Sequence, residues 1–506
     1  MHRREFLRYS ALGGVGIAAS GPAGPLLAGD DWLAAYREGR RENAWAIGLR
    51  SIDAERLEAP LEVLHGQLPQ GLRGSFYRNG PALHELGGRR YHHWFDADGM
   101  VHAFRFTDAG LTHRGRYVQT HKHRAEREAG RFLRPAFGTR FADMTSLDNP
   151  DAANAANTSV LPHNGRLLAL WEGGSAYGMN PEDLGTDAPV VWSDATAGLP
   201  FSAHPSIEPD GTLWNFGLSV SVSSGQLILY EIAPDGSLRR AQAVALEETP
   251  MVHDFAVTQR YLVFLMPPFH LQRERFADQA MSFLDSHRWE PHKPMRALVV
   301  DKADWSRRRW FELPAGFVFH LGGGWDEGQV IHLDYERYPD PGIVADFARG
   351  IMRGRADTEP SADVTGVRLD MARGTARQET LAEHSEFPRL HPARVGRRYR
   401  YRYSLSVDGE ATHPFQNAVR RLDMDAGAEH RYRFAPTDIA EEHVVVRKPG
   451  LDDETAAWLV GTVLDTRAQR TRLTVFDAAT LADGPVFEAA LPYALPLGFH
   501  GNFAPA

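Results

Sequence analysis

The sequence predicts an all-β fold, and a β-propeller of about seven blades accounts for it better than a sandwich. Short apolar alternations such as GQLILYEI, RYLVFLM and TRLTVF recur from about Leu61 onward. Turn pairs separate them, for example Asn164-Gly165 and Asp210-Gly211, and this combination is typical of many short antiparallel strands. A four-stranded blade with its loops takes roughly 60 to 70 residues, so about seven blades would use this length.

One domain accounts for most of the chain. Its 506 residues are 43% hydrophobic and 24% charged, which allows a large core. The 47 glycines and 32 prolines are spread along the chain and no charged or Ser/Gly-rich run divides it. We therefore expect a single propeller over residues 61–506 after a polar, partly helical lead-in over residues 30–60. Convincing helical patterns are few, and the best cover Leu271–Leu284 and Pro341–Met352.

The N-terminus resembles a twin-arginine export signal, which we assign to residues 1–29. Arg3 and Arg4 precede a mildly apolar, Gly/Ala-rich stretch. A GxGxxA pattern within it follows no strand and opens no βαβ unit, so we reject a nucleotide site there. No other segment approaches the roughly 20 apolar residues that span a bilayer. We expect an exported, periplasmic protein that is soluble or at most peripheral to a membrane.

Charge and composition exclude several classes of function. The net charge of −9 argues against a nucleic-acid binder. The basic-aromatic stretch over residues 397–403, RRYRYRY, predicts an amphipathic strand with its arginines on one face. There are no cysteines, so any metal must be held by His, Asp or Glu. No P-loop, HExxH or GxSxG motif is present in the mature region.

Four histidines stand far apart in similar apolar, Gly/Pro-punctuated segments: His204, His253, His320 and His500. Such residues usually pack in a core. Their spacings of 49, 67 and 180 residues, however, are near one, one and three blades. A propeller brings its innermost strands together on a central axis, so four equivalent histidines could gather there around one metal.

Three further stretches carry a resemblance to a known family. They are Gly71–Phe106, with RNGP and FDADGM, Asn154–Tyr177, with NAANTS and WEGG, and Ser385–Leu390, SEFPRL. Together with GFHGNF around the last histidine, they resemble the carotenoid cleavage oxygenases. That family includes apocarotenoid- and stilbene-cleaving enzymes and the vertebrate retinoid isomerase. The resemblance runs from about Leu61 to the C-terminus.

The resemblance implies a seven-bladed propeller capped by a small α-helical dome, with one non-haem Fe²⁺ per chain on the axis and O₂ as co-substrate. The ligands would be His204, His253, His320 and His500. Glutamates would hydrogen-bond to three of these imidazoles: Glu172, Glu386 and Glu442, with the neighbouring Glu441 as the alternative third. Neutral imidazoles leave the site at +2 with open positions, and the carboxylates fix each ring's tautomer.

The chain departs from the family pattern near the third ligand. The usual His-x-x-Asn-Ala-aromatic-Glu reads HLGGGWD here, and Ala97 replaces a common glycine in the FDADGM motif. Neither change removes a ligand. Lys122 and Tyr177 are candidate contacts for a phenolic substrate. We expect surface or turn roles for the paired histidines of HH and HKH, and turn roles for the two aspartates of FDADGM: His92, His93, His121, His123, Asp96 and Asp98.

The predicted activity is oxidative cleavage of a C=C bond in a carotenoid or apocarotenoid, giving two carbonyl products. No catalytic side chain is needed beyond the metal centre. Cleavage of a lignin-type stilbene remains an alternative. Rivals from other classes are a lactonase-type propeller hydrolase and a non-catalytic carotenoid-binding propeller. The expected partner is a hydrophobic conjugated small molecule, with no nucleic acid and no obligate protein partner. Residues 264–284 could contact a membrane.

Overall fold

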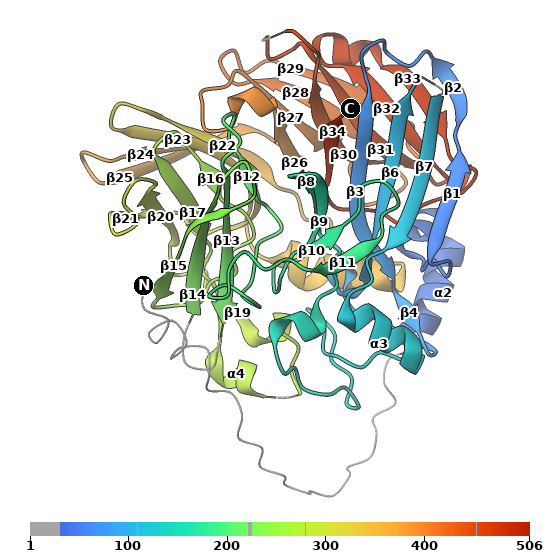
Figure 1. Ribbon diagram of the computed structural model, residues 1–506, viewed down its shortest axis with the longest axis horizontal. Coiled ribbons are helices and arrows are strands. Elements are labelled where there is room, and N and C mark those ends of the chain that lie inside the picture. The colour runs from blue at the N-terminus through green and yellow to red at the C-terminus, as the bar shows by residue number, and fades with distance from the viewer. Residues whose placement is uncertain (1–30, 109, 221–224, 279, 452) are drawn as a thin grey trace, which may run out of the picture.

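The computed structural model describes residues 31–108, 110–220, 225–278, 280–451 and 453–506, so the predicted export signal lies outside the described residues. Antiparallel sheets of four or five strands follow one another around an axis (Figure 1). Seven of them form the blades, as the sequence predicted, and short helices gather on one side of the molecule.

Each blade is an antiparallel sheet whose innermost strand faces the axis. From its outermost to its innermost strand, blade 1 contains β1 (Arg56–Pro60), β7 (Gly110–Tyr117), β6 (Asp98–Thr107), β3 (Gly74–Leu83) and β34 (Gly501–Pro505). In the same order, blade 2 contains β11 (Thr186–Pro189), β10 (Tyr177–Met179), β9 (Arg166–Leu170) and β8 (Ser159–His163). Blade 3 contains β15 (Leu238–Leu246), β14 (Gly225–Ile232), β13 (Leu213–Val220) and β12 (Ser206–Ile207). Blade 4 contains β21 (Arg308–Leu313), β20 (Met295–Asp301), β17 (Tyr261–Met266) and β16 (Ala256–Val257).

The remaining blades complete the ring. Blade 5 contains β25 (Thr375–Ala382), β24 (Asp363–Asp370), β23 (Val330–Tyr338) and β22 (Phe317–Glu327). Blade 6 contains β29 (Glu429–Arg433), β28 (Ala418–Asp423), β27 (Tyr401–Ser406) and β26 (Ser385–Leu390). Blade 7 contains β2 (Glu62–Gly66), β33 (Pro485–Ala490), β32 (Arg470–Asp477), β31 (Ala457–Asp465) and β30 (Asp438–Arg447).

The two ends of the chain close the ring together. The C-terminal strand β34 pairs with β3 in blade 1, while the N-terminal strand β2 pairs with β33 in blade 7. Blue and red strands therefore lie side by side in Figure 1. This exchange joins the first blade to the last and leaves few free sheet edges.

The strands pack on both faces, because each blade lies between two others. On β17, Val263 and Leu265 belong to the core shared with blade 5, while Leu262 and Phe264 belong to the core shared with blade 3. Successive side chains of a strand point to opposite faces, which explains why this run, YLVFLM, is apolar throughout and buried throughout.

A cap covers one side of the propeller. Its helical turns are α2 (Trp32–Glu42), η1 (Ala44–Leu49), η2 (Trp94–Asp96), α3 (His121–Ala129), η3 (Pro150–Ala153), α4 (Arg273–Ala277), η4 (Leu284–Ser286), η5 (Ile343–Phe347), α5 (Ala348–Gly350) and η6 (Ile351–Arg353). Two hairpins, β4 (Glu85–Leu86) with β5 (Arg89–Arg90) and β18 (Phe269–Leu271) with β19 (His287–Trp289), complete it. Two further turns, η7 (Pro392–Arg394) and η8 (Ala478–Asp483), lie in blades 6 and 7. The dome is thus built mainly from loops and one- or two-turn helices.

The predicted helical segments fared differently. Residues 343–353 are helical, close to the predicted Pro341–Met352. The predicted helix over residues 271–284 is wrong: β18 occupies its start, α4 is a single turn, and η4 begins only at Leu284. The backbone of Leu271 is used by the hairpin with β19, which prevents a helix there. The lead-in holds α2, but its β1 pairs with β7, so the propeller begins at Arg56 and not at residue 61.

The basic-aromatic stretch is a strand only from Tyr401, and its arginines do not share one environment. Arg402 is fully buried, with its guanidinium between the carboxylates of Asp334 and Glu336, while Arg398 pairs with a carboxylate at the surface. Two buried carboxylates compensate the charge of Arg402, which corrects the expectation of one basic face. Within the described residues, no helix has the length and apolar character to cross a membrane.

Candidate metal centre

The four predicted histidines meet on the propeller axis. His204 and His253 stand just before β12 and β16, His320 lies within β22, and His500 directly precedes β34. These are the innermost strands of blades 3, 4, 5 and 1. Their steps around the ring are therefore one, one and three blades, as the spacings in the sequence indicated.

The imidazole nitrogens converge closely. Nε2 of His204 lies 2.9 Å from Nε2 of His253, and Nε2 of His320 lies 3.2 Å from Nε2 of His500. The ligand atoms of all four residues lie within 4.8 Å of one another. Except for His204, which is part-exposed, the rings are buried. The structure therefore brings together all four residues as one cluster.

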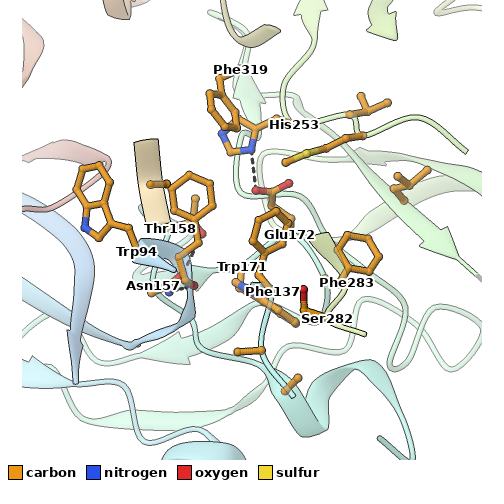
Figure 2. Close-up of a pocket in the computed structure, with 18 of the residues that line it drawn as sticks. Trp94, Phe137, Asn157, Thr158, Trp171, Glu172, His253, Ser282, Phe283 and Phe319 are labelled. Atoms are coloured by element: carbon orange, nitrogen blue, oxygen red, sulfur yellow. Dashed lines mark hydrogen bonds and ion pairs between the residues drawn. The ribbon is translucent and has the colours of Figure 1, made fainter. Parts of the chain in front are cut away.

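Three of the imidazoles are oriented by carboxylates. Nδ1 of His253 lies 2.6 Å from Oε1 of Glu172, a contact drawn as a dashed line in Figure 2. Nδ1 of His320 lies 2.5 Å from Oε2 of Glu386. Nδ1 of His500 lies 2.9 Å from Oε1 of Glu442. The third partner is thus Glu442 and not its neighbour. Each ring donates its Nδ1 proton outward, which leaves its Nε2 lone pair facing the axis.

This proton arrangement fits a bound cation. When both rings are neutral and give their Nδ1 protons to glutamates, the Nε2 atoms of His320 and His500 face each other as two lone pairs. Two lone pairs at this distance repel one another unless a cation lies near both. Nitrogen ligands about 2.1 Å from a metal and at right angles are about 3.0 Å apart, close to the separations observed. The residues present therefore fit a divalent metal ion with four imidazole ligands.

Burial and the neighbouring imidazoles favour the neutral form of His204 and His500. Burial, together with the neighbouring imidazoles, holds the pKa of His204 well below its ordinary value. Burial also lowers the pKa of His500 to about 4, although Glu442 opposes it. For His320 burial acts in the same direction, but the carboxylate of Glu386 outweighs it and raises the pKa. Neutral imidazole is the form that binds a metal.

The glutamates are themselves held in place. Glu386 accepts hydrogen bonds from the Tyr338 hydroxyl at 2.6 Å and from the Phe387 amide at 2.9 Å. Glu442 accepts two hydrogen bonds from the Arg389 guanidinium, each at 2.9 Å. Burial would raise the pKa of Glu442, but Arg389 and the bonded imidazole lower it, so the carboxylate stays ionised. Tyr338, Phe387 and Arg389 were not predicted from the sequence, although the last two lie in the SEFPRL motif.

The RNGP motif supports the loop that carries His500. Buried Arg78 forms an ion pair with Glu441 and donates to the Pro496 carbonyl at 2.8 Å. Glu441 accepts from the Gly498 amide at 2.6 Å. A Cβ at Gly498 would lie only 2.4 Å from the guanidinium, so glycine is required by close approach. This motif therefore acts on the metal centre through the backbone.

A cavity of about 1040 Å³ opens from the metal centre toward the cap. His253, His320 and His500 form its inner end. Its wall is a chain of aromatic rings. Phe319 lies 5.0 Å from His253, Phe95 5.9 Å from Phe319, and Phe137 5.7 Å from Phe95, all measured between ring centroids. Figure 2 shows several of these rings around Glu172 and His253. An apolar, elongated ligand fits such a cavity.

The two residues proposed to touch a phenolic substrate lie elsewhere. Lys122 is fully buried, with its Nζ 2.6 Å from Asp98 and 3.0 Å from Glu126. The Tyr177 hydroxyl accepts a hydrogen bond from the His121 amide at 3.2 Å. Neither residue lines the cavity. The ion pairs of Lys122 satisfy its charge inside the protein, which corrects the expectation of a substrate contact.

Two of the other histidines are buried and hydrogen-bond to groups inside the protein. His93 is buried, with its Nε2 2.8 Å from the Val344 carbonyl, and buried His123 lies with its Nδ1 3.0 Å from Asp98. The aspartates of FDADGM explain part of this. The Asp98 carboxylate pairs with Lys122 and His123 of α3. Asp96 accepts a hydrogen bond from the Gly138 amide at 2.8 Å. A surface role is therefore wrong for both histidines, whereas a turn role is confirmed for His93, which accepts from the Phe95 amide at the start of η2.

Comparison with known proteins places this site in a family. The family model described as retinal pigment epithelial membrane protein matches residues 50–505. An apocarotenoid-15,15'-oxygenase from Synechocystis sp. is 30% identical over 96% of this chain and 98% of its own length. A lignostilbene-α,β-dioxygenase isozyme III from Sphingomonas paucimobilis is 29% identical over 90% of this chain and 96% of its own.

Solved structures agree with the match in sequence. The cobalt-substituted apocarotenoid oxygenase of Synechocystis has a TM-score of 0.82 and 29% identity, over 92% of this chain and 98% of that one. The fold, the converged histidines and the full-length relatives all lead to the same assignment. The chain belongs to the carotenoid cleavage oxygenase family and is an enzyme of its dioxygenase type.

Proposed function

We propose that this protein binds one Fe²⁺ per chain and uses O₂ to cleave a C=C bond of a carotenoid or apocarotenoid. Each alkene carbon takes one oxygen atom of O₂, so that two carbonyl products form. One observation carries the proposal. Four converged imidazoles, three of them fixed by glutamates, form the inner end of a long aromatic cavity.

The chain's own residues bind the metal, orient the conjugated substrate and exclude water from the reacting bond. Bound iron(II) supplies the coordination positions and the electrons that O₂ activation needs. The glutamates keep the Nε2 lone pairs on the axis, and the aromatic wall holds a planar conjugated chain beside it. The lining is mostly apolar, which excludes water from the reacting bond. The position of the bond along the cavity then determines which C=C is cut.

A carotenoid or apocarotenoid substrate is favoured over a stilbene. The Synechocystis relative is named for apocarotenoids and the Sphingomonas relative for lignostilbene. A phenolic ring needs a polar partner for its hydroxyl. Among the described residues lining the cavity there is no lysine, the lining tyrosine, Tyr338, already donates to Glu386, and the one arginine, Arg140, is neither adjacent in sequence to a metal ligand nor hydrogen-bonded to one. The chain of phenylalanines suits a longer polyene.

The two rival functions find less support. A lactonase-type propeller would hold its metal through carboxylate and amide oxygens, whereas the carboxylates here are engaged with imidazole Nδ1 atoms. A non-catalytic pigment binder would not need four lone pairs aimed at one point. Calcium or zinc in place of iron would support the hydrolase, and tight pigment binding without O₂ uptake would support the binder.

The proposal extends to location. Export in a folded state through the twin-arginine route would let iron load in the cytoplasm, and the enzyme would then act in the periplasm or at the membrane surface. Of residues 264–284, none of those described is a large exposed hydrophobic residue, whereas Leu147 at the cavity rim is 42% exposed. Cell fractionation of the wild type and of a variant with Arg3 and Arg4 changed to lysine tests the export. Co-sedimentation with lipid vesicles tests the membrane contact.

The central experiment incubates purified, iron-assayed protein with a carotenoid, an apocarotenoid and a stilbene, and identifies aldehyde products by mass. We expect cleavage of a carotenoid or apocarotenoid by the wild type. His253→Ala and His500→Ala should lose both iron and cleavage. Full activity in either variant would overturn the metal centre, and cleavage of the stilbene alone would overturn the substrate class.

A further inference from the structure

The far end of the cavity lies between two loops of the cap. The aromatic wall continues from Phe137 to Phe283, with centroids 5.9 Å apart, and from Phe283 to Phe276, 6.1 Å apart. Two charged residues lie beside this end. Arg140 follows Phe137 by three residues, Asp278 follows Phe276 by two, and both line the cavity. The wall thus leads from the metal centre to an arginine.

Arg140 differs from the other charged groups around the cavity. It is the one lysine or arginine among the described residues that line it. Nearby Arg134 donates to the Ser146 carbonyl at 2.7 Å and lies 3.8 Å from Asp148. Arg140, by contrast, has no ion pair or side-chain hydrogen bond with any described residue, and Asp278 is the acidic group whose charge acts on it. Burial lowers the pKa of Arg140 and Asp278 opposes this, so the guanidinium is partly desolvated.

We infer that Arg140 forms a subsite for the carboxylate end of an apocarotenoid acid whose polyene lies along the aromatic wall. The inference rests on the proposed cleavage function and names its substrate class. A guanidinium presents paired N–H donors that match a carboxylate, and charge-assisted hydrogen bonds of this kind are about twice as strong as neutral ones.

An anchor at this end would also select the bond. A polyene offers many similar double bonds, and an apolar wall alone lets it slide along the cavity. A single polar group fixes orientation in an otherwise apolar site. With the carboxylate held by Arg140, one C=C is placed beside the metal centre, and the same bond is cut in every turnover. A substrate that ends in a hydrocarbon group would leave the guanidinium partly desolvated and without a hydrogen-bond partner.

Asp278 provides a second, opposite test. Its carboxylate is exposed and repels a substrate anion at the same rim. The repulsion is screened by solvent and therefore weaker than the attraction of Arg140. Removing this charge should improve the acid as a substrate, while removing the charge of Arg140 should impair it.

The experiment compares an apocarotenoid acid with its own methyl ester, which has the same polyene and no charge. Iron-loaded wild type, Arg140→Gln, Arg140→Lys and Asp278→Asn are assayed, with Arg134→Gln as the control, an arginine six residues earlier that does not line the cavity. Measurements are kcat/KM for each substrate and the masses of the products. We expect the wild type to prefer the acid by about 10- to 100-fold, the ratio that one charge-assisted hydrogen bond allows.

The variants should differ in their preference for the acid over the ester and in the bond that they cut. Arg140→Gln should lose the preference and give products from more than one bond, Arg140→Lys should retain part of both, and Asp278→Asn should strengthen the preference. Arg134→Gln should leave the ratio unchanged. Equal acid-to-ester ratios in wild type and Arg140→Gln, with both substrates cleaved, would overturn the subsite alone. If the iron-loaded wild type cleaves neither of these substrates nor the carotenoid of the central experiment, the proposed function itself fails. Cleavage of the carotenoid without cleavage of the acid would overturn the subsite alone.

Discussion

Glu441 and Glu442 are consecutive residues of β30, yet each anchors a different part of the segment that carries His500. Glu441 accepts from the Gly498 amide at 2.6 Å, and Glu442 accepts from the Gly501 amide at 2.7 Å as well as from the imidazole. The ladder between β30 and β31 shifts register at these two residues. A bulge here lets neighbouring glutamates serve the loop and the metal ligand separately.

Substitutions of the two glutamates should therefore have different effects, one on iron binding and the other on stability. Glu442→Gln should weaken iron binding by about 10- to 100-fold, because the imidazole loses its ionised partner. Glu441→Gln leaves the buried guanidinium of Arg78 without a counter-charge and should lower the free energy of unfolding by about 3–5 kcal/mol. Iron retention against a chelator and urea unfolding measure the two effects. Equal iron loss from both variants in the folded state would contradict this division.

Arg389 should act on the metal through Glu442. Arg389→Gln removes the guanidinium that holds this carboxylate by two hydrogen bonds. We expect iron to dissociate about tenfold faster, with partial rescue in Arg389→Lys, which keeps the charge. Stopped-flow chelation of the single variants and of the double variant with Glu442→Gln gives the coupling. Simple additivity of the two changes would show that Arg389 acts by another route.

Phe387 adopts a left-handed backbone conformation beside the metal centre, with φ of 55°. Its ring lies 5.3 Å from the rings of His320 and His500. Alanine and glycine both remove the ring, but glycine tolerates this φ and alanine does not. We expect Phe387→Ala to be less stable than Phe387→Gly by about 1 kcal/mol. Urea denaturation measures the difference, and an alanine variant that equals the glycine variant would argue against backbone strain.

Asp96 should make stability depend on pH. Burial raises the pKa of this carboxyl to about 6, although the Gly138 amide and Thr139 hydroxyl oppose it. An acid whose pKa is raised by folding contributes stability below its unfolded pKa and loses it as pH rises through the folded pKa. Relative to Asp96→Asn, the wild type should lose up to about 3 kcal/mol of unfolding free energy between roughly pH 4 and pH 6.

Comparing the two proteins at each pH cancels the titration of the other buried groups, including Asp334. Unfolding free energies from urea curves across this range give the difference directly. A constant difference between wild type and Asp96→Asn over the whole range would mean that the carboxyl titrates normally.

The sequence predicted the strands well because their signal is local. The apolar run of β14 and the turn pairs between strands depend on neighbouring residues, and together with the length of the chain they led to the right number of blades. Helices of the cap were harder. Leu271–Leu284 has an apolar pattern that suits a helix, but its first residue pairs with β19, a partner distant in the chain. Burial of His93 and His123 was missed for the same reason, since their partners come from other segments.

By itself the sequence determined the strand pattern and indicated about seven blades, and its resemblance to a known family singled out the four histidines with Glu172 and Glu386. Only the tertiary structure decided between Glu441 and Glu442, because a register shift in β30 sets which carboxylate reaches His500. It also placed Lys122 in a buried ion pair and Arg140 at the cavity rim. Local patterns record what a residue prefers, whereas a side chain's partners depend on which distant strands and loops the fold brings beside it.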